Sequence, residues 1–582
     1  MARVVYKCLP DMGKARNRVA SPKTIREEIK ASPEVKEFAK GRSYSIVTFG
    51  CQANVRDEEI LSGYLEFAGF SKAKDPSEAD FVIINTCAVR ENAEEKVYGE
   101  IGRYKAKSLL DKNFVLAVCG CMMQEENVAK KIMASYPYVN LIFGTHNIHK
   151  ILELLDEHLA RKKDLVDIMS FQGDIIENLP STRLDSYKAY VNITYGCDKF
   201  CTYCIVPYTR GRERSRSKED ILKECKELVE EGYQEITLLG QNVNSYGKDF
   251  KDGTSFATIL EEVAKLGVPR LRFMTSHPWD FSQEMIDVIA KYPNIMNSIH
   301  LPVQSGSSSM LQRMGRRYTR ESYLDLVRRL REAIPDVSLS TDIIVGFPNE
   351  TEEEFQDTLT LAKEVKYNAA FTFIYSPRKG TPAARLVDSV DDATKHRRFD
   401  ELLKVIEEGV TYHSAKMLGK EYSVLVDGPS KKDKSMLSGY TENGKLVHFL
   451  GPSYLKGTIV KVKIVEDHAF SMKGELIDDP ILVLARKAKA ELAKEEAVIR
   501  YKDYKEKVDS SIEIKNLREE IESSQREMVR LASEGKGEEA AKEKVHYEEL
   551  MSEYKNNPLI LNLSSAGEEL ENLLLEVEGY FS

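Results

Sequence analysis

Three cysteines, Cys197, Cys201 and Cys204, stand in a CxxxCxxC pattern directly after an apolar run at residues 189–195. Three thiolates spaced in this way at the end of a strand can bind three irons of a 4Fe-4S cluster, which leaves one iron open to a small molecule. A structural zinc site needs four ligands, and a thioredoxin-type redox pair needs only CxxC. The spacing of this central triplet therefore favours an iron–sulfur cluster with one open iron.

A second set of cysteines, the N-terminal triplet, consists of Cys51, Cys87 and Cys121. Each follows a short apolar run and precedes a stretch with helical character, which predicts three parallel strands whose ends meet at one edge of a sheet. The runs lie at residues 44–48, 81–84 and 114–118. Buried structural cysteines are the alternative, because a free thiol packs as a small hydrophobic group. We expect these thiolates to converge and hold a second cluster.

The order of the two triplets resembles that of the methylthiotransferase family, and within it the MiaB-type tRNA enzymes, which use radical S-adenosylmethionine (SAM) chemistry. The resemblance implies two 4Fe-4S clusters, with SAM on the open iron of the central triplet and an auxiliary cluster on the N-terminal triplet. Cys8, Cys119 and Cys225 match no ligand position of the family. We predict no catalytic residue beyond the six cluster ligands.

Strands and helices alternate six times through the middle of the chain, which predicts a partial TIM-type (β/α)6 barrel with its chemistry at the carboxyl ends of the strands. The expected strands lie at residues 187–194, 235–239, 271–275, 298–302, 338–345 and 371–375. The resemblance places SAM-contacting residues in the loops of this barrel. These are Tyr203, Gly240, Gln241, Gln304, Ser305, Asp342 and Gly346. The loops at 240–247, 276–278 and 301–306 resemble the branch that acts on N6-isopentenyladenosine in tRNA.

A chain of 582 residues is too long for one core. We predict an α/β multidomain protein with five segments: a basic extension at 1–43 with a helix near 24–40, an α/β methylthiotransferase domain at 44–170, a radical SAM barrel at 183–413, a small β-barrel at 416–478, and a helical bundle at 480–582. Short β-like runs at 422–426, 445–449 and 458–464 resemble an RNA-binding TRAM domain. The last segment resembles small helical YlbF/YmcA-type proteins.

The net charge of −9 is unevenly distributed. Residues 485–582 carry 16 basic and 23 acidic side chains, whereas residues 1–44 carry 11 basic and 5 acidic ones. Basic clusters also follow the central triplet, at Arg210, Arg212, Arg214 and Arg216, and such clusters can neutralise phosphates. No apolar run reaches the ~20 residues that span a bilayer, and the N-terminus lacks the apolar core of a signal peptide. With cysteines in ligand-like positions, we expect a cytoplasmic protein without membrane contact.

The resemblance implies methylthiolation of carbon 2 of N6-isopentenyladenosine at position 37 of tRNA, with tRNA as partner and an electron donor such as flavodoxin or ferredoxin. Three alternatives stay open: methylthiolation of a ribosomal protein, methylthiolation of another tRNA adenosine, and an RNA-binding iron–sulfur sensor without catalysis. We expect the C-terminal helices to bind a protein partner. A charged tail that only aids solubility is the other interpretation of this segment.

Overall fold

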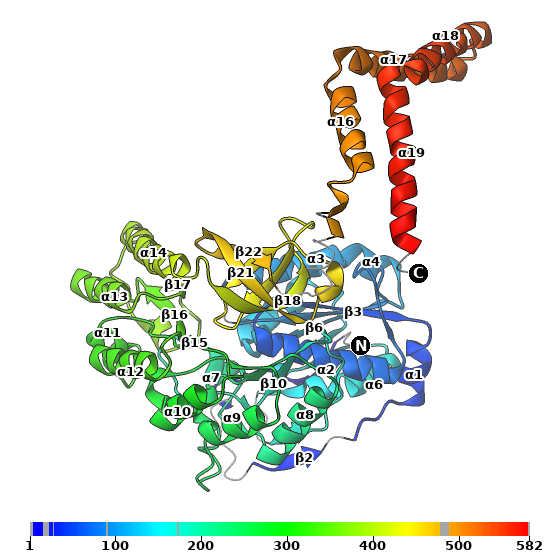
Figure 1. Ribbon diagram of the computed structural model, residues 1–582. Helices are drawn as coiled ribbons and strands as arrows, with labels where there is room; N and C mark the ends of the chain where they lie inside the picture. The colour runs from blue at the N-terminus through cyan, green and yellow to red at the C-terminus, as the bar shows by residue number, and fades with distance from the viewer. Residues whose placement is uncertain are drawn as a thin grey trace. The chain divides into compact units, whose positions relative to one another are not determined.

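The computed structural model describes residues 4–14, 22–26, 28–88, 91–170, 174–477, 488–489 and 491–579. The chain forms two compact units, Met1–Ile477 and Asp478–Ser582, which we describe separately. Figure 1 shows the elements of both.

A parallel sheet forms the N-terminal part of the larger unit (Figure 1). Its strands are β1 (Val4–Cys8), β3 (Ser43–Thr48), β4 (Ser71–Lys72), β5 (Phe81–Thr86), β6 (Val115–Gly120), β7 (Leu141–Phe143) and β8 (Asp164–Asp167). Their order in the sheet is β1-β8-β7-β6-β5-β3-β4, and every pair is parallel. The chain passes from β3 to β4 on one side and then to β5 on the other. The switch point at which such folds bind ligands therefore lies between β3 and β5.

Helices cover both faces of this sheet. The helices are α1 (Pro33–Ala39), α2 (Gln52–Ala68) and α6 (Ile151–Arg161) on one face, and α3 (Glu91–Arg103) and α5 (Glu126–Ser135) on the other, with α4 (Lys105–Leu110) after α3. Strand β5 shows how the sequence supports both layers. Phe81 and Ile83 enter one apolar core, and Val82 and Ile84 enter the other. Successive side chains of a strand point to opposite faces, so a continuous apolar run suits a strand covered on both sides.

The N-terminal segment differs from the prediction. The expected helix at 24–40 is wrong in its first part, because Thr24–Arg26 forms strand β2, which pairs with β9 (Ile175–Glu177). Helix α1 begins only at Pro33, and the Ser32 hydroxyl accepts a hydrogen bond from the Val35 amide. Proline at the first helical position and serine at the N-cap both define a helix start at this point. Strand β1, which joins β8, was not predicted at all.

The central part contains the six predicted strands in two parallel sheets. The first sheet is β10 (Lys188–Asn192), β13 (Glu235–Leu239) and β14 (Arg270–Phe273), and the second is β15 (Ser298–His300), β16 (Ser338–Val345) and β17 (Ala369–Ile374). A parallel bridge between Leu271 of β14 and Ile295 places the segment just before β15 next to β14. The alternating helices are α8 (Lys218–Glu230), α9 (Phe256–Lys265), α10 (Gln283–Lys291), α11 (Ser308–Arg313), α12 (Arg320–Ala333), α13 (Glu352–Val365) and α14 (Asp392–Ala415). One apolar core joins both sheets to all of these helices except α11, which confirms the (β/α)6 prediction.

A closed five-stranded barrel completes the larger unit. It consists of β18 (Glu421–Pro429), β19 (Leu437–Thr441), β20 (Leu446–Phe449), β21 (Ile459–His468) and β22 (Ser471–Leu476), of which β19 and β22 were not predicted. In β21, Val462 and Ile464 are buried whereas Lys461 and Lys463 are exposed. This alternation places apolar side chains inside the barrel and lysines on its surface.

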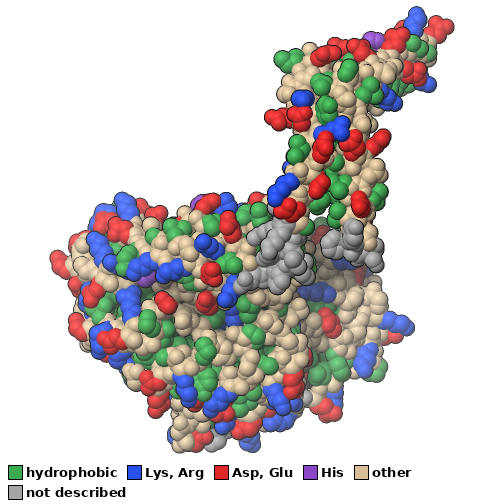
Figure 2. All heavy atoms as spheres, viewed as in Figure 1, with side chains coloured by type: hydrophobic (Ala, Val, Ile, Leu, Met, Phe, Trp, Pro, Cys, Tyr) green, Lys and Arg blue, Asp and Glu red, His purple; other side chains and the backbone are tan. Residues whose placement is uncertain are grey.

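The C-terminal unit is helical, as predicted. Its long helices are α16 (Glu496–Ser510), α17 (Ile512–Ser533), α18 (Gly537–Asn556) and α19 (Pro558–Gly579). Helix α16 lies beside α19, and α17 lies beside α18 (Figure 1). Acidic and basic side chains are interspersed along these helices in Figure 2. None of the described helices of the chain is both long and apolar enough to cross a membrane.

Candidate active site

The N-terminal triplet lies at the carboxyl ends of three neighbouring strands. Cys51 follows β3 and is the N-cap of α2, Cys87 follows β5, and Cys121 follows β6. The three strands are in parallel register, with Thr48 opposite Asn85 and Thr86 opposite Gly120. The register brings the three cysteines to one edge of the sheet.

Two glycines allow these strand ends to approach one another. Gly50 has a φ of +139°, and a Cβ built on it would lie 2.8 Å from the Cβ of Cys87. Gly120 has a φ of +101°, and its Cβ would lie 2.3 Å from the carbonyl oxygen of Thr86. Only glycine fits at both positions, because a side chain would meet the neighbouring strand end and the left-handed backbone is strained for other residues.

Hydrogen bonds hold α2 to the end of β5, and the end of β5 to β6. Asn54 Nδ2 donates to the Thr86 carbonyl at 2.9 Å, and Asn85 Nδ2 donates to the Asn54 carbonyl at 2.9 Å. The Thr86 hydroxyl donates to the Cys119 carbonyl at 2.5 Å. Cys119 therefore contributes its backbone carbonyl to this hydrogen bond, whereas Cys121 contributes its side chain to the triplet.

Arg210 connects the N-terminal triplet to the barrel. Its Nε donates to Cys121 Sγ at 3.1 Å, and its Nη2 lies 2.8 Å from Asp57 Oδ2. Burial raises the pKa of the Cys121 thiol to about 12, and the positive charge of Arg210 acts in the opposite direction. A metal ligand is deprotonated on binding, so a fixed cation beside Cys121 stabilises the ligating form.

The central triplet occupies a loop between two short antiparallel strands, β11 (Thr194–Tyr195) and β12 (Arg214–Ser215). Gly196 begins the loop with a φ of +71°, and a Cβ on it would lie 2.2 Å from the Arg212 carbonyl oxygen. The Cys197 amide donates to the Gly211 carbonyl at 3.1 Å. The Cys204 amide donates to the Cys201 carbonyl at 3.0 Å, just before the short helix α7 (Val206–Thr209). These bonds fold the loop back on itself.

The far side of the barrel anchors the same loop. The Thr202 amide donates to the Met314 carbonyl at 2.9 Å, and the Ala383 amide donates to the Thr202 carbonyl at 2.9 Å. Arg316 is buried, and its Nη1 donates to Cys201 Sγ at 3.6 Å while its Nη2 donates to the Pro302 carbonyl at 2.8 Å. Each triplet therefore has one arginine directed at one of its thiols.

The two triplets adjoin one apolar cluster. Cys121 is buried with Ala88, Ile205 and Tyr208, and Phe200 packs against this group. Phe200 precedes Cys201 and Ile205 follows Cys204, so side chains of the central loop cover a cysteine of the N-terminal triplet. The fold has brought two sites that are about 75 to 150 residues apart in sequence to one place.

The donor sets of both triplets fit 4Fe-4S clusters. All six cysteines are free thiols. In the part of the chain that the structure describes, no three Cys, His, Asp or Glu side chains converge as ligands of a single metal ion do. The ligands of a cubane bind different irons, so three separate thiolates are the donor set that such a cluster with one open iron needs.

The expected SAM-contacting residues lie at the carboxyl ends of the barrel strands. Gly240 and Gln241 follow β13 and line a solvent-open hollow of about 740 Å³. Tyr203 is half-buried within the central loop and packs against a small group of buried apolar side chains that includes Phe347. Gln304 has a φ of +68°, and its backbone N–H donates to the backbone carbonyl of Asp342 at 2.8 Å. Gln304 thereby joins the end of β15 to β16.

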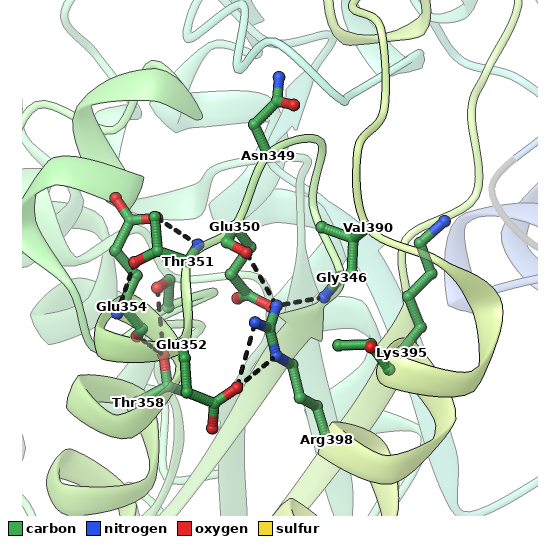
Figure 3. Close-up of polar contacts among 12 residues, drawn as sticks. Gly346, Asn349, Glu350, Thr351, Glu352, Glu354, Thr358, Val390, Lys395 and Arg398 are labelled. Carbon is green, nitrogen blue, oxygen red and sulfur yellow. Dashed lines mark hydrogen bonds and ion pairs between the residues drawn. The ribbon is translucent and has the colours of Figure 1, made fainter.

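Three other expected residues have partners within the protein. Ser305 Oγ lies 3.2 Å from a threonine hydroxyl on α13, and Asp342 lies 3.4 Å from the Nε2 of His300. The Gly346 amide donates to Glu350 Oε2 at 2.8 Å, and Arg398 binds the same carboxylate at 3.0 Å (Figure 3). The Gly346 amide therefore orders the turn after β16.

Four further polar side chains lie in the loops predicted at 240–247 and 276–278, outside the predicted site residues. Asn242 Oδ1, the Asn244 amide group, Ser276 Oγ and His277 Nε2 are buried and have no hydrogen-bond partner among the described residues. They follow β13 and β14, at the same end of the barrel as the central triplet. A buried polar atom without a partner costs about 1–3 kcal/mol, so this end of the barrel suits a polar organic ligand such as SAM.

Four known protein families match successive parts of the chain. Residues 43–144 match the Uncharacterized protein family UPF0004, residues 191–362 the Radical SAM superfamily, residues 415–477 the TRAM domain, and residues 481–581 the family Control of competence regulator ComK, YlbF/YmcA. The tRNA-2-methylthio-N(6)-dimethylallyladenosine synthase of Bacillus subtilis is 49% identical over 475 residues, which cover 81% of this chain and 93% of the relative. The chain belongs to this synthase family.

Two further synthases support the assignment. The Staphylococcus haemolyticus synthase is 50% identical over 481 residues, which cover 81% of this chain and 93% of the relative. The Geobacillus kaustophilus synthase is 48% identical over 475 residues, which cover 81% and 90%. The predicted membership of the MiaB-type group is confirmed, and so is the predicted combination of domains.

Sequence reasoning missed the two arginines that face the thiols. Arg210 was noticed only as part of a basic cluster, although its position six residues after Cys204 was a usable signal. Arg316 lies 112 residues after Cys204, in a turn with no motif. Only the folded barrel brings it to Cys201.

Proposed function

We infer that this protein methylthiolates carbon 2 of N6-isopentenyladenosine at position 37 of tRNA. The observation that carries this inference is the 49% identity with a tRNA-2-methylthio-N(6)-dimethylallyladenosine synthase over 81% of the chain. The two cysteine triplets beside one apolar cluster supply the matching chemistry. One site generates a radical, and the other carries sulfur.

The triplets have separate roles in this proposal. Cys197, Cys201 and Cys204 would hold the cluster that binds SAM, and Cys51, Cys87 and Cys121 would hold the auxiliary cluster. When bound, these groups supply a carbon-centred radical and a sulfur atom for an unreactive C–H bond. The apolar side chains between the triplets exclude water from the path between them, which protects a radical from side reactions. Gly240, Gln241, Gln304 and Asp342 contribute to the SAM site at the barrel edge.

The domains divide the remaining work. We propose boundaries at 44–170 for the auxiliary-cluster domain, 183–413 for the radical SAM domain and 416–478 for the TRAM domain. Exposed Lys461 and Lys463 on β21 give the TRAM barrel charges for the phosphates of tRNA. An electron donor such as flavodoxin or ferredoxin would reduce the cluster of the central triplet. Because tRNA is the substrate, we expect the enzyme in the cytoplasm.

The C-terminal helices form a partner-binding module in this proposal. Their match to the YlbF/YmcA family and their own compact unit support a role separate from catalysis. The excess of acidic side chains there repels phosphates at short range, which argues against a second tRNA-binding surface.

Nucleoside mass spectrometry of tRNA tests the function. Cells without the protein should lack the methylthio-isopentenyl nucleoside and accumulate its precursor without the methylthio group. Complementation with the wild-type chain should restore the product, and complementation with the Cys197→Ala variant should not. An unchanged nucleoside profile in the deletion strain would contradict the proposal and favour a protein substrate or a sensor.

A further inference from the structure

Four arginines alternate along residues 210–216, and three of them bind carboxylates. Arg210 pairs with Asp57, Arg212 with Asp198, and Arg216 with Glu177 and Glu224. Arg214 differs from its neighbours. No carboxylate of the described residues lies within ion-pair distance of its guanidinium, and its Nε has no hydrogen-bond partner among them.

The unpaired arginine is also deeply buried, since Arg214 is only 8% exposed. Burial lowers the pKa of Arg214 to about 10, so the side chain still carries its charge at neutral pH. The Arg214 guanidinium lies over the Tyr195 ring, 5.8 Å from its centroid, and Asp174 and Asp249 act on its charge only from beyond ion-pair distance. A buried charge without an ion-pair partner is costly, and proteins keep such charges paired or use them to bind ligands. An anion bound beside Arg214 would offset this cost.

Arg214 lines the hollow of about 740 Å³ described above, and so does His146. His146 is 6% exposed, and its Nε2 has no partner among the described residues. Burial and the charges of Arg214 and Arg210 lower the pKa of His146 to about 3, so its imidazole is neutral. The Thr209 backbone carbonyl takes the one N–H of this neutral ring, so the unpartnered Nε2 carries a lone pair. It can accept a hydrogen bond from an anion that still bears a proton, as hydrosulfide does.

The same hollow reaches the N-terminal triplet. Asp57 and Arg210 line it, and Arg210 Nε donates to Cys121 Sγ at 3.1 Å. Asp174 is a further lining carboxylate, but its Oδ1 accepts a hydrogen bond from the Lys23 amide. Arg214 and Arg210 therefore line one hollow, and Arg210 contacts the Cys121 thiol.

We propose that Arg214 and His146 bind hydrosulfide, a small sulfur anion, at the entrance to the auxiliary site. The inference rests on the proposed function, because methylthiolation consumes one sulfur atom in each turnover and the sulfur must reach the N-terminal triplet. A small anion can reach side chains that are less than a tenth exposed, as Arg214 and His146 are, whereas the phosphate of an RNA chain needs an open surface. Gly240 and Gln241, which we assign to the SAM site, also line this hollow, so SAM and the anion would be neighbours. The unpartnered side chains after β13 and β14 are not among the lining residues and suit the carboxylate of SAM.

The test varies sodium sulfide in an anaerobic assay of the full chain with both clusters, tRNA, SAM and a chemical reductant. Arg214→Gln should raise the half-saturating sulfide concentration on the order of tenfold, the contribution of one charge-assisted hydrogen bond. Product formation at saturating sulfide, KM for SAM and KM for tRNA should stay near wild-type values. Arg272→Gln is the matched control, because Arg272 is a barrel arginine already paired with Glu235 at 3.4 Å, and it should leave the sulfide dependence unchanged.

Thermal unfolding gives a readout independent of turnover. Without sulfide, Arg214→Gln should unfold at the same temperature as the wild type or higher, because an unpaired buried charge is removed. Sulfide should stabilise the wild type and not the variant. A wild-type protein that is stabilised by sulfide but makes no methylthiolated nucleoside would refute the proposed function and leave the anion site intact.

Three results would overturn the anion site. The first is a sulfide dependence that is the same in Arg214→Gln and the wild type. The second is a selective rise in KM for SAM or for tRNA, which would assign Arg214 to a carboxylate or phosphate. The third is a large loss of thermal stability in the variant without sulfide, which would assign Arg214 a structural role.

Discussion

Replacing Glu224 by glutamine should destabilise the larger unit by roughly 3 kcal/mol. Glu224 lies on α8 of the barrel and binds three arginines from different parts of the chain, of which Arg56 and Arg216 are buried. The distances are 3.0 Å to Arg56 on α2, 2.7 Å to Arg183 in the segment before the barrel, and 2.7 Å to Arg216 after β12. Glu59 also binds Arg56 and Arg183, and Glu177 binds Arg216. The three arginines and three glutamates balance in charge.

The magnitude follows from the acidity of Glu224. Burial raises its pKa, but the charges of Arg216, Arg56 and Arg183 outweigh burial and lower it from 4.5 to about 2. At about 1.36 kcal/mol for each pKa unit, this difference corresponds to roughly 3 kcal/mol of unfolding free energy at neutral pH. Removing one partner from a buried ion pair costs a similar amount, about 3–5 kcal/mol, because a charge is left without compensation.

Urea unfolding at pH 7, followed by circular dichroism and by the fluorescence of the single tryptophan, Trp279, measures this loss. Glu227→Gln is the matched control on the same helix. Glu227 is about half exposed and lies 3.9 Å from Lys223, so its loss should cost less than about 1 kcal/mol. Equal effects of the two substitutions would refute the role of the buried network.

The pH dependence gives a second check. Because the pKa of Glu224 is lower in the folded state, its stabilisation is complete above about pH 4.5 and is lost as the pH falls toward 2. The difference between wild type and Glu224→Gln should be constant from pH 7 to about 5.5 and should narrow below pH 4.5. A difference that grows on acidification would contradict the sign of this argument.

Three further predictions concern the clusters and the C-terminal unit. Alanine at all three cysteines of the central triplet should leave about half of the iron after anaerobic reconstitution and abolish reductive SAM cleavage; full iron content would contradict the ligand assignment. Alanine at all three cysteines of the N-terminal triplet should preserve SAM cleavage and stop methylthiolation, and normal methylthiolated product would show that the second cluster is dispensable. Truncation after Asp479 should keep iron content and tRNA methylthiolation while removing any partner recovered by pull-down; loss of tRNA binding would place the C-terminal helices in the substrate site.

The cysteine triplets could be predicted because their arrangement depends on local pattern and on one topological rule. Three apolar runs, each followed by a cysteine and a helix, need only the parallel α/β rule to place Cys51, Cys87 and Cys121 at one edge. The six barrel strands were found for the same reason, since each is a short apolar run between helical segments. Strand 235–239 was predicted with the bounds that the structure shows.

The failures involve contacts between distant parts of the chain. Strand β1 pairs with β8, some 160 residues later, and no pattern in Val4–Cys8 specifies that neighbour. The helix predicted at 24–40 followed apolar spacing alone, whereas Ser32 and Pro33 set the true start and pairing with β9 made Thr24–Arg26 a strand. Tertiary pairing overrides weak local preference in such segments.

Segment 210–216 shows how one short stretch can organise two reaction centres. In an extended strand, residues two apart point to the same face. The arginines of this segment reach different elements because the chain is not extended throughout: Gly211 has a φ of +76°, and only Arg214–Ser215 forms a strand. Arg210 reaches α2 and Cys121, Arg212 returns to the central loop at Asp198, and Arg216 joins the ion-pair network around Glu224. Movement of this segment would therefore displace both triplets together. Arg214 is the exception, because no carboxylate of the described residues lies within ion-pair distance of it. A ligand that binds and dissociates best explains a cation without an ion pair in a segment whose other arginines are paired.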